Sequence, residues 1–241
     1  MTLYDRIGVD YDNLRRPDPR LAAPIHTALG NARRVLNVGA GTGSYEPVGR
    51  AVVALEPSAA MIAKRPPGSA PAVQGVAEGL PFDDASFDAA MAVLTVHHWT
   101  DKAAGLAELR RVTTGPIVIV SCDPTVRPWP VDYFPGLAAL DDVAMPPLAL
   151  FETVLGPVEI TPLLVPHDCS DGFLYAWWRR PAAYLDPRIR SGSSSFWIID
   201  GVAAGVARLA DDLASGAWER RHADLLQRDA LDVGYRLIVA R

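Results

Sequence analysis

The chain has 241 residues, 49% of them hydrophobic, with 23 basic and 28 acidic residues and a net charge of −5. This length and apolar content predict one compact domain with elaborations. The scattered basic residues disfavour a nucleic-acid partner, which needs a basic stripe. The two cysteines lack metal-ligand spacing, so neither a disulfide framework nor a metal site is expected.

Two features of the sequence bear on where in the cell the protein is expected. The N-terminal run MTLYDRIGVDYDNLRR carries acids and arginines where a signal peptide needs an apolar stretch. No apolar run of the sequence reaches the length of a membrane span. We therefore expect a cytoplasmic protein that does not enter a membrane and is a monomer or a homodimer.

Residues 1–30 are predicted to form an N-terminal helical cap. Aromatic and apolar residues recur at loose helical spacing from Tyr4 to Leu14, and a second run, LAAPIHTALG, has an apolar face. This second run ends at Gly30, a residue that suits a helix C-cap. We expect two short helices ahead of the main fold.

Residues 31–122 show a different pattern. Short apolar or β-branched runs alternate with helix-compatible segments, and the runs read VLNVG, VVALEP, VQGVA, FDAAMAVLTV and PIVIVSC. Apolar strands that alternate with helices imply a parallel sheet covered on both faces. The sequence therefore predicts an α/β fold whose core occupies this range.

Residues 123–230 are predicted to continue the sheet, with helical insertions that cover the substrate. This stretch begins with a run rich in proline and aromatic residues, contains the strand-like VEITPLLVP and shows helical periodicity from residue 171 onward. Residues 231–241 belong to the run LDVGYRLIVA and are predicted to form the terminal strand of the core.

The most informative motif is an apolar run, residues 35–38, that leads into Gly39, Gly41 and Gly43. Positions without side chains let the backbone approach a ligand at the carboxyl end of a strand. Glu56 ends the next apolar run, where a carboxylate can accept hydrogen bonds from a ribose diol. A ribose-containing ligand is predicted at this edge of the sheet.

The spacing of the glycines bears on which ligand this is. A dinucleotide-binding fingerprint needs glycine at position 44, where Ser44 stands. An NAD-dependent oxidoreductase is therefore the poorer match, although it would share the strand, the glycines and Glu56.

Three segments, VLNVGAGTG, ALEPSAAMI and GVAEGLPFDDASFDAAMAVLTVHHW, follow one another over about residues 34–120. They resemble the motifs of class I S-adenosylmethionine (SAM) dependent methyltransferases, in the small-molecule, type 11 branch that includes ubiquinone and menaquinone biosynthesis enzymes. The resemblance implies a Rossmann-like, seven-stranded sheet with an N-terminal helical cap and helical insertions near the C-terminus. It also implies SAM as the cofactor and transfer of its methyl group to a small-molecule acceptor by in-line displacement.

The resemblance further implies roles for residues. The three glycines would line the methionine part of SAM, and Glu56 would hold the ribose hydroxyls. The other implied cofactor contacts are Asn37, Ala40, Pro57, Met61, Ala77, Glu78 and Val96. Family members commonly have aspartate where Asn37 stands and often where Val76 stands. An amide can still bond the SAM ammonium group, whereas valine cannot bond the adenine amino group.

Two adjacent histidines follow the fourth apolar run, at the edge where ligands bind in open α/β sheets. Because an imidazole can act as a base near neutral pH, His97 is the candidate catalytic base. The substrate candidates are His98, Trp99, Tyr11, Trp129 and Tyr133. The alternative for each of these side chains is a structural role, either in packing or in a backbone hydrogen bond.

A second alternative to the methyltransferase interpretation is a non-catalytic regulator or partner subunit that binds SAM or another metabolite. Asn37, Val76 and the absence of an unambiguous base keep it open.

Overall fold

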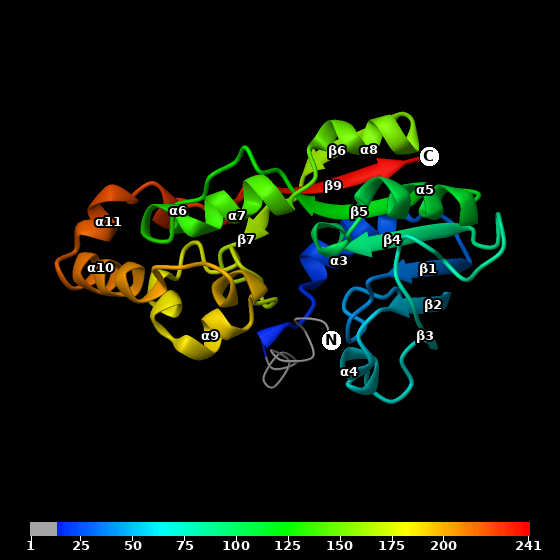
Figure 1. Cartoon of the computed structure of the whole chain (residues 1–241). Helices are drawn as coiled ribbons and strands as arrows, with labels where there is room; N and C mark the ends of the chain where they lie inside the picture. Colours follow the sequence, from blue (N-terminus) through cyan, green and yellow to red (C-terminus); the bar gives the residue numbers. More distant parts are fainter. Residues whose placement is uncertain (1–13) are drawn as a thin grey trace.

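The computed structural model describes residues 14–241, and at its centre is a seven-stranded sheet in the order β3-β2-β1-β4-β5-β9-β6 (Figure 1). The strands are β1 (Arg34–Val38), β2 (Ala51–Glu56), β3 (Ala72–Gln74), β4 (Ala89–Val93), β5 (Ile117–Cys122), β6 (Val158–Pro162) and β9 (Tyr235–Ala240). β1 to β5 pair in parallel, and β9 runs antiparallel to both of its neighbours. The predicted seven-stranded α/β sheet is confirmed.

The apolar runs form strands here because both faces of the sheet are covered. All six residues of β5 and all six of β9 are buried. Alternate residues of a strand point to opposite faces. In β1, Leu36 and Val38 accordingly join one hydrophobic cluster and Val35 joins the other.

Helices cover both faces. α5 (Lys102–Val112) and α8 (Leu148–Leu155) pack on one face, where Leu109 of α5 is fully buried. α3 (Pro19–Ala28) packs on the other face through Ile25.

The predicted N-terminal cap falls partly within the described residues. Its second helix is α3, which is capped by Leu29 and followed by Gly30 at a φ of +56°. The first predicted helix lies almost entirely in residues 1–13, outside the described part of the chain.

A second group of elements lies beyond the end of the sheet (Figure 1), and we call it the auxiliary region (residues 128–145 and 163–231). Its elements are α6 (Pro130–Tyr133), α7 (Gly136–Ala144), β7 (Val165–Pro166), η2 (Pro181–Leu185), α9 (Pro187–Ser191), η3 (Ser194–Trp197), α10 (Val202–Ala214), α11 (Ala217–Arg221), η4 (Leu225–Gln227) and β8 (Ala230–Leu231). None of the helices within residues 14–241 is long and apolar enough to cross a membrane.

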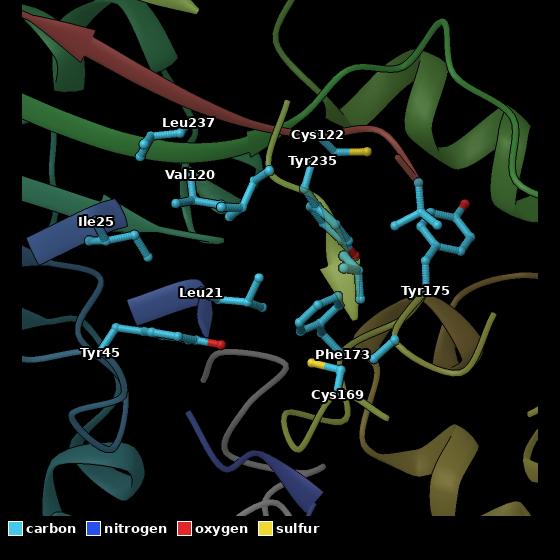
Figure 2. Packing of buried hydrophobic residues seen from close by; sticks show 14 of the residues in the cluster. Leu21, Ile25, Tyr45, Val120, Cys122, Cys169, Phe173, Tyr175, Tyr235 and Leu237 are labelled. Atoms are coloured by element: carbon cyan, nitrogen blue, oxygen red, sulfur yellow. The ribbon is translucent and has the colours of Figure 1, made fainter. Parts of the chain in front are cut away.

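Aromatic side chains hold the auxiliary region together. Trp129 makes edge contacts with Tyr133, Tyr184 and Trp218, with ring centroids 5.8, 5.4 and 5.2 Å away. The packing continues to the sheet, because these rings belong to the same cluster as the α3 face. Figure 2 shows Phe173 and Tyr175 of the auxiliary region beside Tyr235 at the start of β9.

The run LDVGYRLIVA divides between two strands. Ala230 and Leu231 form β8, which pairs with β7 in a separate two-stranded sheet, and β9 begins only at Tyr235. Gly234, between them, has a φ of +98°. A left-handed residue redirects the chain, so the two halves of the run pair with different partners.

Candidate active site

The carboxyl ends of β1, β2 and β4 open into a cavity of about 420 Å³, which we call the first cavity. Its volume lies within the range of roughly 300–1,000 Å³ that is usual for small-molecule sites. The predicted site residues that line it are Asn37, Gly39, Ala40, Gly41, Glu56, Pro57, Met61, Ala77, Glu78, His98 and Trp99. The parallel sheet brings them together because its strands all end at the same edge.

The turn after β1 is shaped by Gly39. Its φ is +67°, and an added Cβ would lie 1.9 Å from Oγ1 of Thr95. The N–H groups of Gly39 and Ala40 both donate to the carbonyl of Leu55, at 2.8 and 3.1 Å. Only glycine fits this turn, because Thr95 occupies the space that a side chain would need.

Glu56 lies at the tip of β2 with only 6% of its surface exposed. One carboxylate oxygen accepts the N–H of Gly41 at 2.8 Å, and the other accepts the N–H of Ser58 at 2.9 Å. Ser58 in turn caps α4 (Ala59–Ala63) by accepting the N–H of Met61. The carboxylate is therefore fixed at the wall of the first cavity.

Asn37 belongs to a hydrogen-bond network that the sequence did not indicate. Its side-chain amide donates to Glu46 at 3.2 Å, and Arg65 donates to both carboxylate oxygens of Glu46 at 2.7 and 2.8 Å. Arg65 also donates to the carbonyl of Gly41 at 3.3 Å. This buried ion pair supports the glycine turn from outside the cavity. No spacing rule links residues 37, 46 and 65, so only the tertiary structure identifies it.

Two of the predicted cofactor contacts lie beside the first cavity without lining it. The N–H of Gly43 donates to the carbonyl of Ala40 at 2.9 Å and closes the turn. Val96 is 1% exposed and packs in a hydrophobic cluster of the sheet. Val76, where a hydrogen-bonding residue is common in the resembled family, lines the first cavity with 53% exposure.

The adjacent histidines belong to η1 (Val96–His98) and face different spaces. His98 lines the first cavity, whereas His97 lines a second cavity of about 60 Å³. Arg15 and Leu94 line both cavities and form the boundary between them. The second cavity is also lined by Cys122, Asp141, Met145, Phe173, Leu174, Tyr175, Gly192, Ser193, Ser194, Ser195 and Tyr235.

The surroundings of both histidines favour the neutral form of the imidazole. Desolvation lowers the pKa of His97 well below its ordinary value, and the positive groups of Lys102 and Arg15 act in the same direction. The pKa of His98 is lowered to about 4, first by desolvation and then by Arg15 and Lys102. A neutral imidazole can accept a proton, so His97 is chemically able to act as a base toward a molecule in the second cavity.

Arg15 is fixed at the boundary by a buried ion pair. Its guanidinium lies 2.6 Å from a carboxylate oxygen of Asp171, whose side chain is 1% exposed. The hydroxyl of Tyr45 donates to the same carboxylate at 2.8 Å. Leu94, the other boundary residue, has a left-handed φ of +53°. Such backbone strain in a branched residue concentrates at functional sites.

The aromatic substrate candidates have separate places. Trp99 is buried at the wall of the first cavity. The indole N–H of Trp129 donates to the carbonyl of Trp178 at 2.7 Å, and the hydroxyl of Tyr133 donates to Asp212 at 2.6 Å, both within the auxiliary region and away from the two cavities. Tyr11 lies outside the described residues.

Among residues 14–241, no group of three or more His, Cys, Asp or Glu side chains is placed to hold a metal ion.

Comparison with known proteins places this geometry in context. A family model described as a methyltransferase domain matches residues 36–115. The crystal structure of a candidate methyltransferase from an antibiotic biosynthesis pathway of Anabaena variabilis is 33% identical, with a TM-score of 0.87. The alignment covers 95% of this chain and 99% of that one.

Two further relatives extend the comparison. The YcgJ protein from Bacillus subtilis shares the fold, with 19% identity over 92% of this chain and 97% of that one and a TM-score of 0.55. The malonyl-[acyl-carrier protein] O-methyltransferase of Erwinia pyrifoliae is 40% identical over 94 residues. That match covers 36% of this chain and 36% of the curated relative, so only about a third of that relative's length is spanned.

Proposed function

The chain belongs to the SAM-dependent methyltransferases, and we propose that it transfers the methyl group of SAM to a small molecule whose reacting end enters the second cavity. The observation that carries this proposal is the pair of adjoining cavities, with Arg15 and Leu94 as their boundary and His97 on the far side. In such an arrangement the cofactor and the acceptor occupy neighbouring cavities, and their reacting ends meet at the shared boundary.

The volume of the first cavity, about 420 Å³, and its lining residues support the assignment of SAM to it. Its turn after β1 carries no side chain at Gly39 and Gly41, its wall carries the fixed carboxylate of Glu56, and Met61 and Ala77 provide apolar surface. Two carboxylates, of Glu56 and Glu78, line it, which suits a cationic cofactor. We assign the ribose hydroxyls to Glu56 and the methionine part to the glycine turn.

When bound, SAM supplies an electrophilic methyl group on a sulfonium sulfur. The residues of this chain then have to align the acceptor, exclude water and, for an acceptor that carries a proton, remove that proton. Arg15 and Leu94 position the acceptor at the boundary. His97, neutral because its pKa is lowered, accepts the proton.

The size of the second cavity supports a small acceptor or the small end of a larger one. Its volume of about 60 Å³ accommodates a single functional group. The Anabaena variabilis relative, aligned over 95% of this chain, is described as part of an antibiotic biosynthesis pathway, which also fits a small-molecule acceptor. We further propose a cytoplasmic monomer or homodimer that uses neither nucleic acid nor a membrane.

The test begins with calorimetric titration of the purified protein with SAM, S-adenosylhomocysteine and NADH. It continues with release of S-adenosylhomocysteine in the presence of hydroxyl, thiol, amine and carbon acceptors. Binding of both sulfur nucleosides without NADH, and turnover with at least one acceptor class, is the expected result. Binding of NADH alone would replace the proposal with an oxidoreductase, and SAM binding without turnover on any acceptor would replace it with a regulator.

A further inference from the structure

Asp141 is the acidic side chain that lines the second cavity. It lies on α7 and is 2% exposed. The hydroxyl of Tyr175 donates to one of its carboxylate oxygens at 3.0 Å. Within residues 14–241 it forms no ion pair. A buried carboxylate with a single hydrogen bond and no cation is costly, because burial removes the water that would solvate it.

The groups around Asp141 do not compensate its charge. Burial raises the pKa of the Cys122 thiol to about 12 and raises the pKa of Tyr175 and of Tyr235 far above neutrality, so all three stay uncharged. The lowered pKa of His97, which lines the same cavity, favours its neutral form as well.

The nearby arginines are already paired. Arg15 is held by Asp171 at 2.6 Å, and Arg127 forms an ion pair with Asp142, the residue after Asp141 in the chain. In keeping with this environment, desolvation raises the pKa of Asp141, while the Tyr175 hydroxyl and Arg127 oppose that rise. A cation entering the second cavity would restore the ionised carboxylate.

Aromatic rings form another part of the same wall. Phe173 and Tyr235 meet edge to face with centroids 4.8 Å apart, and Tyr175 lies 6.4 Å from Tyr235. Figure 2 shows these three rings grouped where the auxiliary region meets the start of β9. Aromatic rings attract ammonium groups through the negative potential of their faces.

We propose that the methyl acceptor carries a basic amine, and that its ammonium group is bound in the second cavity by the carboxylate of Asp141 and the rings of Phe173, Tyr175 and Tyr235. A cavity of about 60 Å³ has room for an ammonium group and the first carbon of its chain. The inference rests on the proposed function, since it assigns the second cavity to the acceptor. The ammonium group is the end of the acceptor that the proposed function places in the second cavity, so its nitrogen is the reacting atom once a proton has been removed. The inference concerns recognition before that step, and no bond is formed or broken in it.

The experiment measures binding to protein saturated with S-adenosylhomocysteine, by ligand-observed NMR titration. The probes are two matched pairs: butylamine with butan-1-ol, and 2-phenylethylamine with 2-phenylethanol. Each pair is measured on the native chain, on Asp141→Asn and on Asp211→Asn. The last variant is the control, because Asp211 is an exposed carboxylate of α10 that does not line the cavity, and its substitution leaves the ion pair of Arg127 with Asp142 intact.

The native chain and Asp211→Asn should bind each amine at least about tenfold more tightly than its alcohol, the usual size of a charge-assisted contact. Asp141→Asn should lose this preference while binding S-adenosylhomocysteine and unfolding thermally as the native chain does. Equal binding of amine and alcohol, an unchanged preference in Asp141→Asn, or no binding of any probe would overturn the inference. Failure to bind S-adenosylhomocysteine would instead overturn the proposed function on which it rests.

Discussion

Single residues fix the two ends of the proposed reaction. Glu56 uses its two carboxylate oxygens to hold the N–H groups of Gly41 and Ser58, so the carboxylate is oriented before any ligand arrives. His97, by contrast, is oriented by its place in η1, next to the ring of His98, which lies at a centroid distance of 3.9 Å and is tilted by 47°. In the proposed function, Glu56 serves binding of the cofactor and His97 serves the chemical step, and these two proposed roles predict different responses to substitution.

Glu56→Gln is expected to weaken the binding of SAM and of S-adenosylhomocysteine roughly tenfold to a hundredfold, because a neutral amide replaces the charged carboxylate that would accept the ribose hydroxyls. The measurement is calorimetric titration. Glu152→Gln, on the exposed side of α8, is the matched control and should bind both nucleosides normally. An unchanged affinity in Glu56→Gln would remove Glu56 from the ribose site.

His97→Gln is expected to lower kcat by about 10²–10⁴-fold, the usual contribution of a general base, without changing the affinity for S-adenosylhomocysteine. Since the pKa of His97 lies well below its ordinary value, the native enzyme should keep its rate as the pH falls through about 6.5 and lose it only in more acidic solution. His98→Gln, in the first cavity, should affect the nucleoside instead. A rate that is insensitive to His97→Gln would exclude the base.

Among the structural elements, the turn after β1 and the helix α3 depend on single interactions. In the turn, the side chain of Thr95 lies against Gly39 and leaves no room for a Cβ. The N-cap of α3 is Asp18, which is completely buried. Its carboxylate accepts the N–H of Arg20 in the first turn of the helix and the N–H of Ser170 from the auxiliary region. Both elements are therefore held by contacts to residues distant in sequence.

Gly39→Ala is expected to reduce the free energy of unfolding by about 2–5 kcal/mol, the sum of left-handed strain and overpacking against Thr95. Gly49→Ala is the control. Gly49 also has a positive φ, of +80°, but nothing lies within 4 Å of an added Cβ. Gly49→Ala should therefore reduce the free energy of unfolding only by the left-handed strain, about 1–2 kcal/mol. Chemical denaturation measures both, and equal losses would show that Thr95 does not matter.

Asp18→Ala is expected to reduce the free energy of unfolding by about 2–4 kcal/mol, since a helix cap is removed and the N–H of Ser170 loses its acceptor. Asp186→Ala removes the cap of α9, a helix without buried residues, and should cost about 0.5–1 kcal/mol. Similar losses measured by denaturation for the two variants would contradict the role of Asp18 in joining α3 to the auxiliary region.

The carboxylate of Asp18 also makes the stability of the fold depend on pH. The hydrogen bond from the Arg20 side chain holds the pKa of Asp18 well below its ordinary value of 3.8. Because the folded pKa is the lower one, this contribution is present above pH 3.8 and is lost as the pH falls further toward the folded value. The free energy of unfolding, measured at decreasing pH, should therefore fall less steeply in Asp18→Ala than in the native chain.

Across the whole molecule, one carboxylate joins three parts of the chain. Asp171 of the auxiliary region binds Arg15 of the N-terminal segment and Tyr45 of the loop after β1. The backbone repeats this connection, because the N–H of Gly172 donates to the carbonyl of Leu14 at 2.8 Å. The boundary between the two cavities is thus assembled only when the sheet, the N-terminal segment and the auxiliary region are all in place.

Asp171→Asn is expected to destabilise the protein by about 3–5 kcal/mol, because the buried guanidinium of Arg15 loses its charge partner. Asp84→Asn breaks an exposed pair with Arg111 and should cost at most about 1 kcal/mol. Thermal unfolding of both variants provides the comparison. A loss of less than about 1 kcal/mol in Asp171→Asn would show that this pair does not hold the parts together.

The sequence alone determined the fold class and pointed to one edge of the sheet. Its apolar runs encode strands locally, and parallel strands end at the same edge, so Gly39, Glu56 and His98 were expected near one another before any tertiary structure was known. Most of the residues suggested for the cofactor do line the first cavity. Their individual contacts with SAM, and the substrate roles of Tyr11, Trp129 and Tyr133, stay predictions.

Only the tertiary structure decided the second cavity. Its lining runs from Arg15 to Tyr235 and includes Asp141 and Tyr175, residues that no local periodicity or spacing connects. It also decided that two adjacent histidines line different cavities, although their ring centroids lie only 3.9 Å apart. A strand pattern is read from neighbours in sequence, whereas the burial of Asp141 and the pairing of Arg15 with Asp171 arise from packing between distant segments, where the physical constraint is the shape and charge of the assembled core.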